Sequence, residues 1–363
     1  MGDDMRDEIK TAMLMVAIVA TVVVGIGVYF TSLDVPVQNT AMHKFDKLGL
    51  KKAPEMLGIA GYINADQTLE DHLRGKVVLY DIWTYSCINC QRTIPYLTAW
   101  HERYSDKGLV IVGIHSPEFE FEKDINNVRL AVEKFGIEYP VVLDNDKKIW
   151  DAFENRYWPR KYIADDEGYI RYDHIGEGAY DETEKVIQEL LQKRAEKIGL
   201  NIAVAQPLVE IREFEHSSRT PELYFGYNFA YGRNKLGNQE GFQPERDVIY
   251  SIPDKIHENY FYLEGTWKNL EDRMVLVSDT GKIVLPYHAK QVNIVAGGKS
   301  DLDILINDIP IPAEISGSDV SDGKASISEF TLYNLVDSEI ATSQVMEIRV
   351  NSPGFEIYTF TFG

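Results

Sequence analysis

The chain has 363 residues, 44% of them apolar, which is enough for two folded domains of ordinary size. The formal net charge of −20 argues against nucleic acid as a partner, because phosphate backbones bind basic surfaces. There are two cysteines, so the chain can form at most one internal disulfide.

The first predicted element is an apolar run from Ala12 to Phe30. At about 1.5 Å per residue, a helix of this length just crosses a hydrocarbon core of about 30 Å. Arg6 and Lys10 precede the run, and this bias places the N-terminus in the cytoplasm. Residues 1–30 are therefore predicted to be a cytoplasmic stub and an uncleaved single-pass anchor in the cell membrane, followed by a tether over residues 31–53.

Beyond the tether, the pattern of apolar residues changes once, from alternating strands and helices to strands alone. Residues 54–198 alternate between strand and helix patterns, which predicts an α/β domain. Residues 199–220 are predicted to be a linker. Residues 221–363 contain many short strands with Gly, Asn and Asp turns, which predicts an all-β sandwich of the jelly-roll-like kind.

Cys87 and Cys90 lie three residues apart, between an apolar strand (Val77–Trp83) and a predicted helix (Gln91–Tyr104). The start of a helix favours the thiolate form of a cysteine, and the thiolate is the nucleophile. We expect Cys87 to attack a disulfide and Cys90 to resolve the mixed disulfide. The alternatives are two inert core thiols or a zinc site, although no second pair of zinc ligands is evident.

Asp81 interrupts the apolar strand six residues before Cys87. Burial raises the pKa of such a carboxyl group, which can then take the proton of Cys90 as that thiol attacks. The alternative is an acid on an edge strand that faces water. Pro159 follows Trp158 at the entry to a later strand, where an X–Pro bond can be cis.

The order Asp81, Trp83, Cys87, Cys90 and Pro95 resembles the thioredoxin active site. Five segments are more specifically similar to the DipZ-like group of the membrane-tethered TlpA/ResA-like proteins: Trp83–Arg92, Asn155–Pro159, Thr220–Tyr227, Tyr287–Lys290 and Phe360–Gly363.

The resemblance extends over residues 54–363 and implies a thioredoxin-like fold followed by a carbohydrate-binding-module-like β domain. It also implies that Pro159 is the cis-proline beside the dithiol. We expect substrate contacts from the residues that surround the two cysteines, which are Trp83, Tyr85, Ile88, Asn89 and Trp158. DipZ-like proteins carry a polytopic electron-conducting membrane domain, whereas this chain has one apolar segment, so its membrane electron donor is unidentified.

The sequence thus predicts a membrane-anchored thiol–disulfide oxidoreductase with an extracytoplasmic catalytic domain. Cys87, Cys90, Asp81 and Pro159 form its catalytic set, and it exchanges disulfides with exported proteins without a metal or organic cofactor. One alternative is a thiol peroxidase, because the domain also resembles the peroxiredoxins, which place a Thr three residues before the reactive Cys, as Thr84 stands before Cys87. Another is a copper-binding or copper-delivery protein, because soft thiolates suit Cu(I).

The predicted β domain is rich in aromatic residues that either bind carbohydrate or, as the alternative, fill the core or face the redox domain; these are Tyr224, Tyr227, Tyr231, Trp267 and Tyr287. Every residue assigned to the chemistry lies between positions 81 and 159. Residues 221–363 are therefore expected to be dispensable for disulfide exchange.

Overall fold

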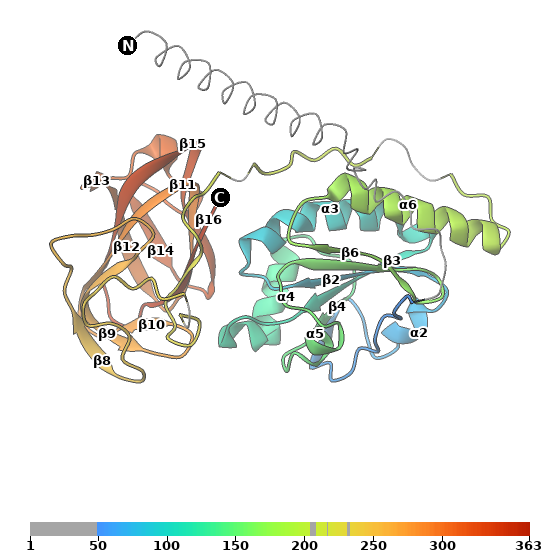
Figure 1. Ribbon diagram of the computed structural model, residues 1–363, viewed down its shortest axis with the longest axis horizontal. Helices are drawn as coiled ribbons and strands as arrows, with labels where there is room; N and C mark the ends of the chain where they lie inside the picture. Colours follow the sequence, from blue (N-terminus) through green and yellow to red (C-terminus); the bar gives the residue numbers. More distant parts are fainter. Residues whose placement is uncertain (1–48, 204–207, 216, 231–232) are drawn as a thin grey trace, which may run out of the picture. The chain divides into compact units, whose positions relative to one another are not determined.

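The computed structural model describes residues 49–203, 208–215, 217–230 and 233–363 (Figure 1). The predicted membrane anchor and most of the predicted tether lie outside these residues. Within the described ranges, no helix is both long enough and apolar enough to cross a membrane. Residues Lys51–Gly363 form one compact unit, which contains a mixed α/β region and an all-β region.

The α/β region is built on a six-stranded sheet with the strand order β1-β4-β3-β2-β5-β6. Its parallel centre consists of β2 (Val77–Trp83), β3 (Leu109–His115) and β4 (Val141–Leu143). The remaining strands are antiparallel to their neighbours: β1 (Gly61–Ile63), β5 (Arg160–Ala164) and β6 (Ile170–Ile175). Every residue of β2 is buried, as expected for a central strand that is covered on both faces.

Helices cover both faces of this sheet (Figure 1). One core contains side chains of α3 (Ile88–Tyr104), α4 (Ile125–Lys134) and α6 (Tyr180–Lys197). The other contains side chains of α2 (Leu69–Leu73) and α5 (Lys148–Ala152).

The side chains of β2 alternate between the two cores. Leu79 and Trp83 belong to the core beneath α3, whereas Tyr80 and Ile82 belong to the opposite one. Because side chains two residues apart share a face, Asp81 points with Leu79 and Trp83 toward α3, the helix that carries Cys90.

The all-β region forms a second sheet of ten strands, in which every strand pair is antiparallel. The main strand order is β13-β12-β15-β11-β16-β10-β9-β8, while β14 pairs with β12 and β7 pairs with β16. The strands are β7 (Leu223–Tyr224), β8 (Asp247–Tyr250), β9 (Tyr262–Asn269), β10 (Met274–Leu276), β11 (Gly281–Gly297), β12 (Ser300–Ile306), β13 (Ile309–Pro310), β14 (Lys324–Ile327), β15 (Thr331–Val350) and β16 (Glu356–Phe362).

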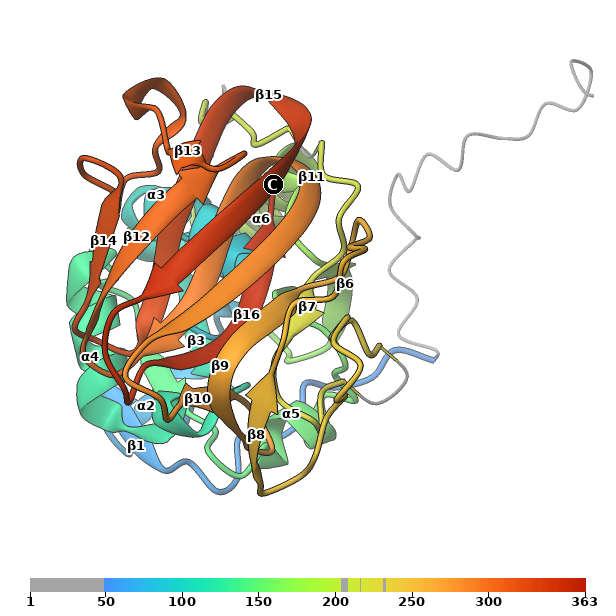
Figure 2. The ribbon, with the colours of Figure 1, turned by 90° about the vertical axis from the view of Figure 1, so that its left-hand side faces the viewer.

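The prediction of many separate short strands was wrong for β11, a single strand of 17 residues (Figure 2). On one side it pairs with β15 along most of its length. On its other side it changes partner, because residues 282–284 pair with β9 and residues 292–297 pair with β16. Because β11 pairs with β15, β9 and β16, it joins these strands in one sheet, and their side chains share one apolar core.

Most of the aromatic residues considered for carbohydrate binding do not form an exposed platform. Trp267 and Tyr287 are buried in the core of the β region. Tyr224 is buried in a cluster that includes Phe119 of the α/β region. Tyr227 is half-buried, and Tyr231 lies outside the described residues. The alternative assignment, to the core or to the face toward the redox domain, is therefore correct for Trp267, Tyr287 and Tyr224.

The segment that was predicted to be a linker packs against α3 and α6. The hydroxyl of Tyr96 donates to the carbonyl of Ile211 at 2.9 Å, and the N–H of Val209 donates to the carboxylate of Glu184 at 2.8 Å. Val209 and Ile211 also contact the apolar core beneath these helices. The segment is thus fixed along the side of the α/β region before the β region begins.

Candidate active site

Cys87 is the N-cap residue of α3, and its Sγ accepts the backbone N–H of Cys90 at 3.3 Å. Both thiols are free, but Cys87 is half-buried whereas Cys90 is 1% exposed. A backbone N–H directed at Sγ from the first turn of a helix stabilises negative charge on that sulfur. The local fold therefore leaves Cys87 the more accessible of the two thiols and shields Cys90.

Burial raises the pKa of Cys90 well above its ordinary value, and the hydrogen bond with Cys87 and the charge of Cys87 raise it further. Such a thiol remains protonated near neutral pH, whereas disulfide exchange requires a thiolate. A thiol of this kind can act as a nucleophile only where a base close by takes its proton.

Asp81 is the carboxyl group nearest in sequence to the dithiol, and it is 1% exposed. Burial raises its pKa to about 7, although Lys161 opposes the rise. The charge of Asp81 also contributes to the raised pKa of Cys90, so the two groups interact. A carboxyl group that titrates near neutrality beside a protonated thiol can accept the thiol's proton.

Lys161 is a buried residue of this site that the sequence prediction missed. It lies opposite Asp81 in the pairing of β5 with β2, it is 0% exposed, and its ammonium group donates to the carbonyl of Gly176 at 3.1 Å. Burial lowers its pKa, while Asp81, and less strongly Cys90, oppose the fall. A lysine inside an apolar strand was the available signal, because a buried charge needs a partner.

Trp83 and Tyr85 are both buried, so the substrate contacts predicted for them do not fit the structure. The ring of Tyr85 stacks on the ring of His115 with centroids 5.7 Å apart, and the ring of Trp83 meets His115 edge-on at 5.2 Å. Burial lowers the pKa of His115 to about 3, so its imidazole is neutral at physiological pH. His115 thus packs against both rings, and its Nε2 accepts the backbone N–H of Tyr85 in the loop that leads to Cys87.

Glu122 anchors the same loop and was also missed by the sequence prediction. The hydroxyl of Ser86 donates to its carboxylate at 2.5 Å, and the backbone N–H groups of Glu118 and Phe119 donate to it at 2.5 and 2.9 Å. Burial raises the pKa of Glu122, although these hydrogen bonds oppose the rise. The residue before Cys87 is thus tied to the loop that follows β3.

The Trp158–Pro159 peptide bond is cis, as the resemblance to thioredoxins implied. Trp158 is half-buried, and its indole N–H donates to the carbonyl of Ser116 at 2.9 Å. Ile88 and Asn89, between the two cysteines, are also half-buried. Of the five predicted substrate contacts, these two residues and Trp158 retain exposed surface.

The β region contacts the dithiol loop directly. Ile88 packs against a cluster that includes Leu332 and Tyr358. The hydroxyl of Tyr85 donates to the carbonyl of Phe330 at 3.0 Å. The surroundings of the dithiol therefore include residues beyond position 221, which the sequence did not predict.

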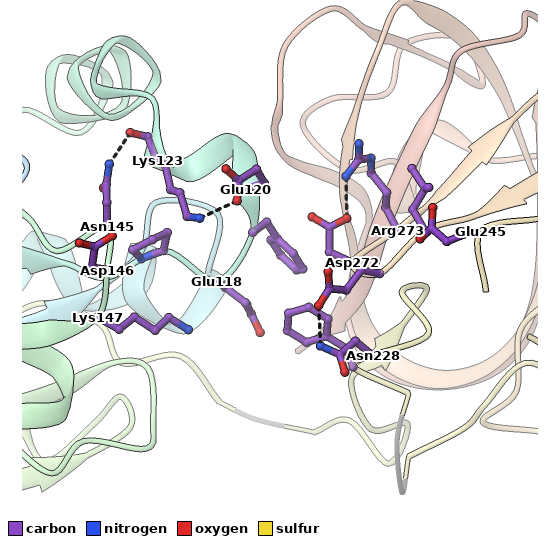
Figure 3. Close-up of a pocket in the computed structure, with 15 residues that line it drawn as sticks. Glu118, Glu120, Lys123, Asn145, Asp146, Lys147, Asn228, Glu245, Asp272 and Arg273 are labelled. Atoms are coloured by element: carbon purple, nitrogen blue, oxygen red, sulfur yellow. Dashed lines mark hydrogen bonds and ion pairs between the residues drawn. The ribbon is translucent and has the colours of Figure 1, made fainter.

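A cavity of about 690 Å³ lies between the loop after β3 and the β region (Figure 3). Most of its charged groups have a partner on their own side of the cavity, as the dashed lines show. The pairs are Lys123 with Glu120, Arg273 with Asp272, and Asn228 with Glu271.

A tyrosine hydroxyl joins two carboxyl groups close to this cavity. The hydroxyl of Tyr224 lies 2.8 Å from Glu118 and 2.9 Å from Glu222. Since one hydroxyl supplies one proton, a second proton on a carboxyl group satisfies both contacts. Burial, followed by the charge of Glu222, raises the pKa of Glu118 to about 8, and burial also raises the pKa of Glu222, so the two carboxyl groups together hold this second proton.

Among the described residues, no group of three or more His, Cys, Asp or Glu side chains has a metal-binding arrangement.

Two family models match the chain. The Redoxin model matches residues 51–191, and the model of the thioredoxin-like C-terminal domain matches residues 220–363. The chain is 34% identical to Protein DipZ of Mycobacterium tuberculosis over 316 residues, which are 86% of this chain and 43% of that protein. The chain therefore spans less than half of the length of this relative.

Two shorter relatives match the α/β region. The thiol-disulfide oxidoreductase YkuV of Bacillus subtilis is 29% identical over 138 residues, which are 38% of this chain and 93% of YkuV. The thiol-disulfide oxidoreductase ResA of Bacillus thuringiensis is 25% identical over 118 residues, which are 32% of this chain and 65% of ResA. With the fold and the dithiol site described above, these similarities establish that the chain belongs to the thioredoxin family, among its DipZ/TlpA-like members.

Proposed function

We propose that the chain is a thiol–disulfide oxidoreductase that acts through Cys87 and Cys90. The observation that carries the proposal is the pairing of a half-buried Cys87 at the N-cap of α3, which accepts the backbone N–H of Cys90, with a Cys90 that is 1% exposed. The names of the relatives YkuV and ResA, both thiol-disulfide oxidoreductases, support the same chemistry.

In the proposed reaction, the Cys87 thiolate attacks one sulfur of a substrate disulfide. The substrate S–S bond breaks, and the first substrate thiol leaves with a proton. Cys90 then transfers its proton to Asp81 and attacks Cys87, so that a Cys87–Cys90 disulfide forms and the second substrate thiol leaves. Two electrons and two protons pass from the protein to the substrate, and the reverse sequence oxidises a substrate dithiol.

Substrate contacts are proposed for Ile88, Asn89 and Trp158, which keep exposed surface around the dithiol. Pro159 follows Trp158 in the cis peptide and completes the proposed catalytic set. The reaction requires no metal or organic cofactor, because the electrons arrive as thiols.

We also propose that the folded regions act outside the cytoplasm, held to the membrane by residues 12–30. The apolar run, the basic residues that precede it and the similarity to DipZ support this location. Exported proteins are then the proposed substrates, and a membrane protein is the proposed electron donor. Residues 54–198 and 221–363 are proposed as the two domains, with residues 199–220 between them.

The function is tested with the purified full chain in detergent, with insulin as a disulfide substrate. The wild-type protein should reduce insulin catalytically with dithiothreitol as the electron source. Cys90→Ser should accumulate a mixed disulfide with substrate, and Cys87→Ser should not. Full activity in Cys87→Ser would contradict the proposal. Hydrogen peroxide in place of insulin tests the peroxidase alternative, and a Cu(I) titration tests the copper alternative.

A further inference from the structure

Arg92 connects the dithiol helix to three other parts of the chain. Its side chain is only 11% exposed. One guanidinium nitrogen donates to the side-chain oxygen of Gln291 at 2.6 Å, and the guanidinium carbon lies 3.4 Å from the centroid of the Phe214 ring. A second guanidinium nitrogen lies 3.9 Å from the carboxylate of Glu177. Arg92 therefore meets β11, the segment that precedes the β region and the turn before α6.

Arg92 also lies within electrostatic reach of the attacking cysteine. Burial lowers the pKa of Arg92, while the charge of Glu177 and then that of Cys87 raise it. Cys87 is the N-cap residue of α3 and Arg92 lies in the second turn of the same helix, about 7.5 Å further along its axis, so a group bound beside Arg92 is close to Cys87. The space around Arg92 is therefore placed to receive a substrate of the dithiol.

A cleft of about 530 Å³ opens beside Arg92. This volume lies within the range of about 300–1,000 Å³ that is typical of small-molecule sites. The cleft is lined by both signs of charge: the cations are Arg92, Arg212 and Lys290, and the carboxylates include Glu177, Glu213 and Asp337.

The charges of this cleft differ from those of the larger cavity in Figure 3, where most groups are paired. Within the described part of the chain, neither Lys290 nor Arg212 forms an ion pair, and the Asp337 carboxylate has none either. Lys290 lies on β11 and Asp337 on β15, and both strands belong to the β region. Cations and carboxylates that are available in one cleft match a ligand that carries both charges itself.

We propose that this cleft binds a small disulfide that carries ammonium and carboxylate groups, of the kind formed by cysteine and short cysteinyl peptides. Arg212 and Lys290 bind the carboxylates of this ligand, Glu213 and Asp337 bind its ammonium groups, and its S–S bond lies toward Cys87. The inference rests on the proposed function and names a substrate class for it. The β region then determines specificity, because it supplies Lys290 and Asp337.

Glutathione disulfide, a zwitterionic probe of this class, reacts as follows. The Cys87 thiolate attacks one glutathione sulfur, the S–S bond of the probe breaks, and one glutathione leaves as a thiol after protonation. Cys90 gives its proton to Asp81 and attacks Cys87, which releases the second glutathione thiol and forms the Cys87–Cys90 disulfide. The reduced protein supplies both electrons.

The test compares glutathione disulfide with 2-hydroxyethyl disulfide, which is uncharged, on the reduced full chain. Lys290→Gln should raise the KM for glutathione disulfide about tenfold, since the loss of one charge-assisted contact costs about 1.4 kcal/mol. The same variant should leave the reaction with 2-hydroxyethyl disulfide unchanged. Lys123→Gln, in the other cavity, is the matched control and should change neither reaction.

Binding is measured separately from chemistry, by calorimetry of glutathione disulfide with the Cys87→Ser/Cys90→Ser protein. Lys290→Gln in that background should weaken binding by the same factor of about ten. The inference is overturned if the double variant does not bind glutathione disulfide, or if Lys290→Gln affects the charged and the neutral disulfide equally. If the wild-type protein reduces neither disulfide, the proposed function fails, while the binding result still decides whether the cleft accepts this ligand.

Discussion

Asp81 on β2 lies directly opposite Lys161 on β5, and both side chains are almost completely removed from solvent. Each charge opposes the effect of burial on the other, so that Lys161 limits the rise in the pKa of Asp81. The pKa of Asp81 nevertheless rises to about 7, because burial outweighs the neighbouring lysine. The site therefore contains a carboxyl group that changes charge in the neutral range.

Asp81→Asn should remove part of the pH dependence of stability. The pKa of Asp81 rises from its ordinary value of 3.8 to about 7 in the folded protein. Protonated Asp81 therefore stabilises the fold below about pH 4, and this contribution, about 4 kcal/mol, is lost as the pH rises through 7. Urea unfolding from pH 4 to 8 should show this fall for the wild type but not for the variant. Parallel curves would contradict the pKa assigned to Asp81.

The same substitution should slow the second step of disulfide exchange. In the wild type, the rate at which Cys90 resolves a mixed disulfide should rise with pH through about 7, where Asp81 becomes a base. In Asp81→Asn this rise should be absent, and the rate should fall by a factor of about 10² or more near neutral pH. Rapid-quench kinetics from pH 6 to 8 measure the step. Unchanged kinetics would remove Asp81 from the mechanism.

Lys161→Met should move the pH profile of resolution to higher pH. Without the ammonium group, nothing opposes the burial that raises the pKa of Asp81, so the midpoint should rise by about one pH unit or more. Lys161→Arg, which keeps the charge, is the control and should restore a midpoint close to that of the wild type. A purely structural role for Lys161 would lower the amplitude of the profile and leave its midpoint in place.

Iodoacetamide should label Cys87 before Cys90. Cys87 is half-buried at the helix N-cap, whereas Cys90 is buried and its pKa is raised. Mass spectrometry of the reduced protein at pH 6.5 should find the label on Cys87, and Cys90 should react after urea unfolds the chain. Label found first on Cys90 in the folded protein would reverse the assignment of attacking and resolving thiols.

Protease added to intact protoplasts should digest residues 54–363. This result follows from an anchor over residues 12–30 with its basic flank in the cytoplasm. A cytoplasmic protein in the same protoplasts serves as the control for lysis. Digestion that occurs only after lysis would place the catalytic region in the cytoplasm instead.

The dithiol and the buried position of Asp81 could be predicted from the sequence because both depend on local order. Cys87 and Cys90 share one turn, and Asp81 interrupts an apolar strand just before them. The partner of Asp81 could not be predicted in the same way. Lys161 meets it through the register of two strands that are far apart in sequence, and one residue of slippage would turn it to the other face.

The contacts with the β region depend on still longer separations. Arg92 and Gln291 are 199 residues apart, and Tyr85 and Phe330 are 245 residues apart. No local sequence pattern predicts these two contacts. For this reason residues 221–363 were expected to be dispensable for disulfide exchange. The alternative that the aromatic residues of the β region fill a core was correct for Trp267, Tyr287 and Tyr224. This alternative could be stated from the sequence because aromatic side chains commonly fill cores as well as bind ligands.

The strand β11 was predicted as separate short strands for a specific reason. Its pairing with β15 shifts register between Ala289 and Gln291, so the apolar pattern of the sequence breaks at Lys290. The same irregularity places Lys290 and Gln291 beside Arg92, at the edge of the proposed cleft.

This irregularity constrains the length of the chain as well as its composition. Side chains alternate along a strand, so deletion of Lys290 would turn the residues on one side of that point to the opposite face. Gln291 would then lose its contact with Arg92 although no residue of the α/β region had changed. A one-residue insertion or deletion here should therefore be tolerated less well during divergence than a substitution at either position.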